Sequence, residues 1–253
     1  MVAGLFSGAP GRLSVSYASA SRTGGRERNE DSVLAIERDG GYCFVVADGL
    51  GGHGLGDEAS KMLVEAFARE FAGAADNREF LARAFDAAQE CILSSQEARG
   101  LNNQMKTTAV ALSIIGGKCA WGHVGDSRLY RFRRGAPIGR TLDHSVPQVL
   151  AQSGEISERE IATHPDRALL LRAVGDRWSG PQYEISKETR LHRHTGFLLC
   201  SDGLWERVPA EGLAPPPGAD AEAWLAAALG EAESAGQGAG DMDNYSAVVV
   251  IVE

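Results

Sequence analysis

Apolar and polar residues follow two different periods in the first hundred positions, and the change of period separates strands from helices. Residues 13–21 alternate apolar and polar side chains, which predicts a half-buried strand. Residues 33–48 predict two strands around an Asp-Gly-Gly turn, the second of them a continuous apolar run typical of a buried strand. Residues 56–72 and 77–98 then space apolar side chains three and four positions apart, which predicts two amphipathic helices. We expect these helices to cover one face of a sheet.

The pattern returns to strands over residues 107–133, where glycine pairs and Gly125-Asp126 mark tight reversals. We interpret this stretch as an antiparallel meander. Residues 143–175 carry a short amphipathic helix, a capping-box pattern that starts at Ser157, and a polar turn, so they resemble an insertion on the sheet.

The last part of the chain predicts a strand that runs to Asp202, a helix near 220–233 and a final strand over 245–252. Strands and helices thus come in blocks instead of strict alternation. This order favours the α+β class, with two stacked antiparallel sheets flanked by helices. We expect one domain over residues 13–253, preceded by a flexible, Gly/Pro-rich segment at 1–12.

Composition narrows the class of protein further. A hydrophobic share of 43% can supply a large core, and the net charge of −9 argues against a nucleic-acid binder. No apolar stretch is long enough for a membrane span, and the N-terminus lacks a secretion signal. The four cysteines stand singly, so we interpret them as buried small side chains in a reducing compartment, and disulfides or zinc ligands as the alternative. We therefore expect a cytoplasmic protein.

Acidic residues stand beside three of the predicted strands. Asp48 and Asp202 end apolar runs and are each followed by glycine, whereas Asp241 and Asp243 precede the last strand. Any one of them could be a turn former that bonds its own backbone. The repeated placement instead favours a rigid, oxygen-rich site for Mg²⁺ or Mn²⁺.

A series of motifs then resembles one family, the PP2C-type (PPM) metal-dependent protein phosphatases, and most closely its compact bacterial branch. The motifs occur in order: NEDS (29–32), VVADGLGGHGLGDEAS (45–60), TTAVALSI (107–114), WGHVGDSRLYRFR (121–133), DHS (143–145), HPDRALLLRAVG (164–175), LLCSDGLWE (198–206) and DMDNYSAVVVIV (241–252). The resemblance implies a four-layer αββα sandwich with the metal centre at one end between the sheets. It also implies an insertion over the rim, the flap, at about residues 143–180.

The resemblance assigns roles to particular residues. It implies that Asp48 bridges two core ions, Mn²⁺ or Mg²⁺, that Gly49 offers its carbonyl, and that Asp202 and Asp243 complete the first ion's shell. A water activated between the two ions would hydrolyse phosphoserine and phosphothreonine in proteins.

Four further roles follow from the same resemblance. Glu30 and Asp31 would meet the second ion or its waters, Asp126 would bind a weaker third ion together with Asp202, and Arg26 would hold the substrate phosphate. We thus expect a catalytic set of Arg26, Asp48 and Asp126 in a monomer that acts on phosphoproteins and opposes a serine/threonine kinase in bacterial signalling.

The chain departs from the family at one position. Some members have a histidine after the Asp-Gly pair, where this sequence has Leu50, so the general acid stays open. The candidates are a water on the third ion, which we favour, and His53, which we interpret more readily as a loop histidine that bonds backbone or caps the helix after it. A basic run at 131–135 is either a solvated strand end or a docking site for acidic phosphoproteins.

Two other functions would leave different signatures in the sequence. A non-catalytic module of the same fold would lack some of the metal acids, and none is missing. A phosphodiesterase or nuclease on another fold would favour histidine-rich ligands and a basic groove, and neither is seen.

Overall fold

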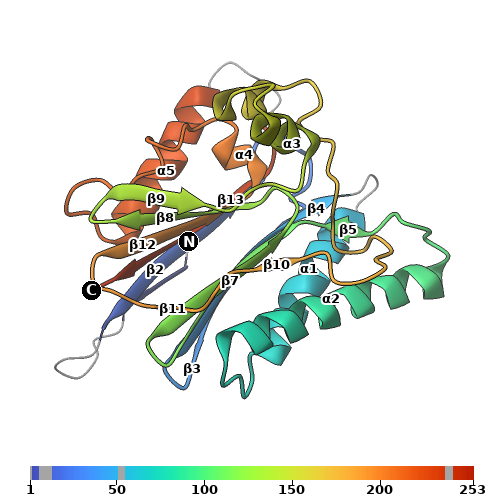
Figure 1. Cartoon of the computed structure of the whole chain (residues 1–253), viewed down its shortest axis with the longest axis horizontal. Helices are drawn as coiled ribbons and strands as arrows, with labels where there is room; N and C mark the ends of the chain where they lie inside the picture. Colours follow the sequence, from blue (N-terminus) through green and yellow to red (C-terminus); the bar gives the residue numbers. More distant parts are fainter. Residues whose placement is uncertain (1, 6–12, 51–54, 237–241) are drawn as a thin grey trace.

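Two antiparallel sheets stack face to face, and helices cover the outer face of each (Figure 1). The computed structural model describes residues 2–5, 13–50, 55–236 and 242–253. The first sheet has the order β1-β2-β13-β12-β8-β9. Its strands are β1 (Val2–Leu5), β2 (Val15–Arg22), β8 (Arg128–Arg133), β9 (Ala136–Arg140), β12 (Thr195–Cys200) and β13 (Tyr245–Val252).

The second sheet has the order β10-β7-β6-β4-β3, and two short strands pair with it at its margins. Its strands are β3 (Asp31–Arg38), β4 (Gly41–Leu50), β5 (Lys106–Thr107), β6 (Ala109–Ile115), β7 (Lys118–Val124), β10 (Glu184–Ile185) and β11 (Thr189–Arg190). Strand β4 lies inside this sheet, between β3 and β6, and residues 41–47 are all buried. A continuous apolar run suits a strand that is covered on both faces.

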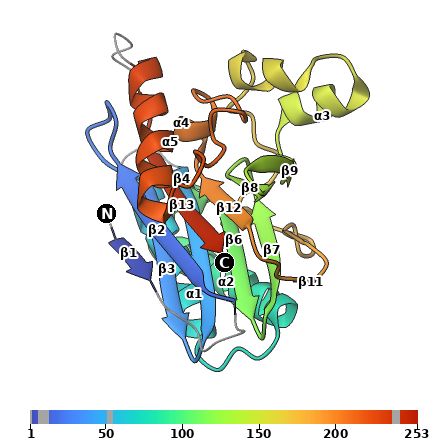
Figure 2. The same ribbon diagram turned by 90° about the vertical axis from the view of Figure 1, so that its left-hand side faces the viewer.

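Helices α1 (Leu55–Glu70) and α2 (Asn77–Arg99) cover the second sheet, and α5 (Ala221–Gly236) covers the first (Figures 1 and 2). The Asp76 side chain caps α2 by accepting hydrogen bonds from two backbone N–H groups of its first turn. The one-turn helix α4 (Asp202–Trp205) follows β12. Helix α3 (Val146–Ser153) and the 3₁₀ helix η2 (Glu158–Thr163) belong to the flap, which projects at the end of the sandwich where α4 lies.

Apolar side chains fill the three interfaces between the four layers. Phe44, with valines and leucines of both sheets, packs between the sheets. Phe67 of α1 and Phe85 of α2 pack together in the core between these helices and the second sheet, and Trp224 of α5 packs against Phe132 of the first sheet. The predicted four-layer α+β sandwich is therefore confirmed.

Three expectations about local structure were wrong. Val2–Leu5, expected to be a flexible lead-in, form strand β1 at the edge of the first sheet. Residues 107–133 are not a single meander, because β7 and β8 belong to different sheets and the chain crosses between them at 125–127. The strand expected to reach Asp202 ends at Cys200, and Asp202 starts α4. A tight turn looks the same in sequence whether the next strand pairs with the last one or joins the opposite sheet.

Three of the four cysteines match the expectation of buried small side chains, whereas Cys91 in α2 is only half-buried. All four are free thiols, and Cys43, Cys119 and Cys200 are buried in strands. Among the helices of the described residues, none has the length and apolar character needed to span a membrane.

Candidate metal centre

The centre begins where β3 and β4 pair. Their antiparallel register places Asp31 directly opposite Asp48. Ser201, one residue before Asp202, donates a hydrogen bond from its hydroxyl to Oδ2 of Asp31 over 2.8 Å. The start of α4 is thereby joined to the β3–β4 pair, and three aspartates from separate parts of the chain converge.

Burial and mutual repulsion make these carboxylates costly to ionise. The pKa of Asp31 is raised to about 7, and that of Asp48 is raised well above its usual value. Burial is the largest cause of both shifts. Burial likewise raises the pKa of Asp126 and Asp202, and the charge on Asp202 adds to the shifts at Asp48 and Asp126. A bound cation would relieve both effects, because it compensates the buried charge and separates the repelling groups.

Two buried oxygen atoms at the centre lack hydrogen-bond partners. Oδ1 of Asp31 and Oδ1 of Asp202 are both inaccessible to solvent and receive no hydrogen bond from the described residues. Buried polar atoms are normally satisfied, so such atoms call for an explanation. Carboxylate oxygens are the ligands that Mg²⁺ and Mn²⁺ prefer, and the donor set therefore fits these ions.

Gly49 lies at a point of close backbone approach. A Cβ atom at this position would lie 2.2 Å from the Gly56 carbonyl oxygen and 2.7 Å from that of Glu30. The Gly49 N–H also donates to the Glu30 carbonyl at 3.2 Å. Only glycine leaves room for the backbone here, which keeps this stretch of chain next to Asp48.

Asn244, which the sequence did not single out as a site residue, holds the loop that carries Glu30. Its side-chain oxygen accepts from the Glu30 N–H at 2.8 Å, and its amide nitrogen donates to the carbonyls of Thr23 and Arg28 at 2.8 and 2.9 Å. Glu30 is thus held near Asp243. The pKa of Glu30 is raised mainly by burial, next by the charge on Asp57 and then by the charge on Asp243. The signal in the sequence was the position of Asn244 beside Asp243 in the DMDN motif.

Arg26 lies at the rim of the centre. Its Nη2 atom is 2.7 Å from Oδ2 of Asp243, and the two side chains are 57% and 43% exposed. Arg26 is therefore beside the proposed ligands and still accessible from solvent.

Asp126 lies on the crossover between the sheets, only 6% exposed. Its carbonyl accepts a hydrogen bond from the Trp205 indole at 3.0 Å. The preceding residue, Gly125, donates its N–H to Nδ1 of His144 at 3.2 Å and accepts from the His144 N–H at 2.9 Å. The backbone on both sides of Asp126 is thus fixed by groups from α4 and from the start of the flap.

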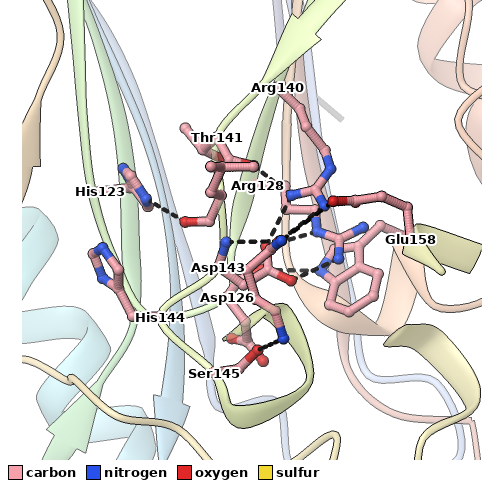
Figure 3. Close-up of polar contacts among 12 residues, drawn as sticks. His123, Asp126, Arg128, Arg140, Thr141, Asp143, His144, Ser145 and Glu158 are labelled. Carbon is pink, nitrogen blue, oxygen red and sulfur yellow. Dashed lines mark hydrogen bonds and ion pairs between the residues drawn. The ribbon is translucent and has the colours of Figure 1, made fainter. Parts of the chain in front are cut away.

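A buried ion pair supports this arrangement (Figure 3). Arg128 donates two hydrogen bonds to Asp143, at 2.8 and 2.6 Å, and its guanidinium lies 3.3 Å from the centre of the Trp205 ring. Arg140 also contacts Asp143 and binds Glu158 of η2. Asp143 therefore connects the flap, through Arg128 and Trp205, to the backbone of Asp126.

A second group of potential ligands, His123, His144 and Glu184, also has its ligand atoms close together. Nδ1 of His144 accepts the Gly125 N–H, so in the neutral ring Nε2 carries the proton and faces Glu184 Oε1 at 3.3 Å. Nη1 of Arg172 donates to the same Glu184 oxygen at 3.3 Å. The group fits a hydrogen-bonded cluster better than a metal site.

Glu206 is a further acid that the sequence reasoning missed, although it ends the LLCSDGLWE motif. Burial, followed by the charge on Asp202, raises its pKa to about 7. Its backbone N–H donates to the Asp202 carbonyl at 2.9 Å. His53, the candidate general acid, lies outside the described residues.

The sequence of this chain matches one protein family and several bacterial relatives. Residues 19–236 match the family model described as "Protein phosphatase 2C". The serine/threonine protein phosphatase PstP of Mycobacterium tuberculosis is 34% identical over 203 residues, which cover 79% of this chain and 38% of PstP. The serine/threonine phosphatase stp of Listeria monocytogenes is 32% identical over 195 residues, 73% of this chain and 75% of stp. The chain thus spans about two fifths of the length of PstP.

Solved structures share the fold. The crystal structure of M. tuberculosis PstP superposes with a TM-score of 0.82 at 30% identity and covers 94% of this chain and 99% of that one. PppA, described as a regulatory component of the type VI secretion system in Pseudomonas aeruginosa, gives 0.79 at 28% identity, with 94% and 98% covered. The catalytic domain of PstP in complex with two manganese ions gives 0.78 at 30% identity, with 95% and 99% covered. On the combined match of motifs, fold and family model, this chain belongs to the protein phosphatase 2C family.

Proposed function

We propose that this protein is a metal-dependent serine/threonine phosphatase that removes phosphate from phosphoserine and phosphothreonine in proteins, opposing a serine/threonine kinase in bacterial signalling. The observation that carries the proposal is the convergence of buried aspartates with two unpartnered oxygens, on Asp31 and Asp202, below an accessible arginine. The names of the bacterial relatives support the same activity.

We assign the metal ligands as the resemblance implies. Asp48, Gly49, Asp202 and Asp243 would hold the core ions with Asp31 and Glu30, and Asp126 would serve a weaker third ion with Asp202. Two manganese ions in the complex of the PstP catalytic domain support the core pair. When bound, Mn²⁺ or Mg²⁺ lowers the pKa of coordinated water and offsets the negative charge of the phosphoryl oxygens.

The remaining tasks are the binding of the phosphate and the supply of the nucleophile. Arg26 would grip the phosphate with its planar fork, because it is exposed and lies beside Asp243. The hydroxyls nearest the acids are engaged in hydrogen bonds, Ser201 with Asp31 and Ser127 with Thr108. As the resemblance implies, we assign the attack on phosphorus to a water that the core ions would activate, and not to a serine of the chain.

Phosphate release from a phosphothreonine peptide, measured with Mn²⁺ and with EDTA, tests the proposal. We expect turnover with Mn²⁺, none after chelation, and none in Asp202→Ala with a retained melting transition. Undiminished turnover in EDTA would contradict the metal assignment. A protein that binds the phosphopeptide without hydrolysing it would favour the non-catalytic module instead.

We also propose an oligomeric state, a domain extent and a cellular compartment for the protein. We propose a monomer with a single domain that includes edge strand β1, acting in the cytoplasm, where the free thiols of Cys43, Cys119 and Cys200 would stay reduced.

A further inference from the structure

Two basic segments lie side by side on the first sheet. Arg133 at the end of β8 pairs with Thr195 at the start of β12, and the Arg134 N–H donates to the His194 carbonyl over 2.8 Å. The turn from β8 to β9 is therefore in contact with the segment that leads into β12. We define the basic patch as Arg133, Arg134, Arg193 and His194.

The arginines of the basic patch are exposed and lack acidic partners. Arg133, Arg134 and Arg193 all lie at the surface, and within the described part of the chain no carboxylate forms an ion pair with any of them. The chain as a whole carries a net charge of −9. Cations that gather without counter-charges on an acidic protein create a local positive potential, which favours an anionic partner.

A cavity of about 490 Å³ opens beside the basic patch. Arg134 and His194 line it, and much of the remaining wall is apolar, from Phe132, Trp224, Ile251 and Pro215–Pro217. Glu253 also lines the cavity, so the surplus of positive charge comes from the turns beside it and not from its wall. An apolar cavity with a few polar groups at its margin is typical of a ligand site.

The patch and the cavity are remote from the metal centre. Strand β12 starts at Thr195, and its six residues lead to Ser201 and then to Asp202 at the start of α4. An antiparallel strand advances about 3.4 Å per residue, so Thr195 and Ser201 lie about 20 Å apart. Figure 1 shows the turn between β8 and β9 on the left and the helices α3 and α4 towards the top right. A ligand at the patch would leave the centre and the flap free.

From these observations we propose that the basic patch and the cavity bind an acidic segment of a partner protein. A large apolar side chain of the segment would fill the cavity, and Asp or Glu residues on either side of it would pair with the arginines. Arg133 and Arg193 do not line the cavity, so the anionic groups have to extend beyond it, which favours a segment over a small molecule. A flat lipid surface would meet the arginines and leave the cavity unfilled. The site would hold the protein at its partner, and it does not depend on the proposed phosphatase activity.

Binding of labelled peptides in EDTA tests the site without catalysis. The probes are short fluorescein-labelled peptides in which Asp and Glu surround a central Trp, Phe or Leu. One control set has Ser at the centre, and a second has Asn and Gln in place of the acids. We expect saturable binding of an acidic peptide with an apolar centre, and a Kd on the order of tenfold higher with Ser at that position. Added salt should weaken the acidic peptides and leave the neutral ones unchanged.

Variants locate the binding. Arg133→Gln combined with Arg193→Gln should raise the Kd of the acidic peptide roughly fivefold, the size expected for two exposed ion pairs. Arg159→Gln combined with Arg177→Gln removes the same charge from exposed arginines of the flap and should retain the wild-type Kd. Ala219→Phe, which places a ring at the cavity wall, should remove the preference for an apolar centre. Should this variant fail to fold, the peptides with Ser at the centre measure the same contact from the side of the ligand.

Three outcomes would overturn the site. They are the absence of saturable binding by every acidic peptide, equal binding of the acidic and neutral sets, and an equal loss of affinity in the flap control. Sedimentation with phosphatidylserine vesicles that is lost in Arg133→Gln with Arg193→Gln, without peptide binding, would assign the patch to a membrane surface instead. Turnover of p-nitrophenyl phosphate by the Mn²⁺-loaded protein should be the same in wild type and in this double variant, so a failure of the proposed function is measured separately.

Discussion

Arg26 donates a hydrogen bond of 2.7 Å to Asp243. Arg26 is nevertheless proposed to bind the substrate phosphate, and Asp243 is proposed to bind a metal ion. An exposed ion pair contributes at most about 1 kcal/mol, so Arg26 can exchange the carboxylate for a substrate phosphate at little cost. A charge-assisted bond to phosphate would form in both the ground state and the transition state. Arg26→Ala should therefore raise KM about tenfold or more and lower kcat less. Arg26→Lys, which keeps the charge without the fork, should fall between, and a fall in kcat at constant KM would contradict the assignment.

Asp126 is proposed to serve a third ion, and a water on that ion is a candidate proton donor to the departing oxygen. Asp126→Ala should lower kcat far more for a phosphothreonine peptide, which expels a basic alkoxide, than for p-nitrophenyl phosphate, which expels a stable phenolate. The ratio of the two losses is the measurement, with Arg26→Ala as the control that should affect both substrates alike. Equal losses on both substrates would leave Asp126 with a structural role only.

Among the elements, the contact between the start of the flap and the crossover depends on one buried ion pair. The side chains of Arg128 and Asp143 are 7% and 1% exposed, so removal of either leaves an uncompensated buried charge. Arg128→Met and Asp143→Leu should each lower the free energy of unfolding by about 3–5 kcal/mol. The double variant should lose clearly less than the sum, because both charges are gone. Denaturant titration of the four proteins measures this coupling, and additive losses would show that the two side chains do not act as a pair.

At the scale of the whole molecule, the buried carboxylates should make stability in EDTA depend on pH in an unusual direction. The pKa of Asp31 is about 7 in the folded chain, above its ordinary value of 3.8, and those of Asp48, Asp126 and Asp202 are also raised. These carboxyl groups thus bind more protons in the folded than in the unfolded chain between about pH 4 and 7, and their contribution to stability falls as pH rises through that range. Burial lowers the pKa of His144 to about 4 and that of His123 as well, so these two groups act in the opposite direction and reduce the net effect.

The melting temperature in EDTA should accordingly be higher at pH 5.5 than at pH 7.5. Added Mn²⁺ should raise it more at pH 7.5, where it meets less competition from protons. Asp48→Asn, which removes one of the repelling charges, should show a weaker pH dependence. A melting temperature in EDTA that rises from pH 5.5 to 7.5 would contradict this account of the centre.

The sequence by itself determined the elements whose signals are local. The apolar run before Asp48 fixes a buried strand, the spacing of Phe80, Leu81, Ala84 and Phe85 fixes a helical face, and the Ser157 capping box is present as expected. The motifs around Asp48, Asp202 and Asp243 were sufficient to indicate the family and to propose the acids of a metal centre, because each proposed ligand lies next to a recognisable strand end or turn.

Only the tertiary structure decided what depends on contacts between distant segments. Gly125-Asp126 reads as a hairpin, yet the chain crosses there to the other sheet, because the pairing partners of β8 lie in β9 and β12. The roles of Asn244 and Asp143 likewise arise from partners far away in sequence or in another element. The identity of one residue does not indicate which distant group satisfies its hydrogen bonds. That pairing is determined only when the sheets pack and water is excluded from the polar groups between them.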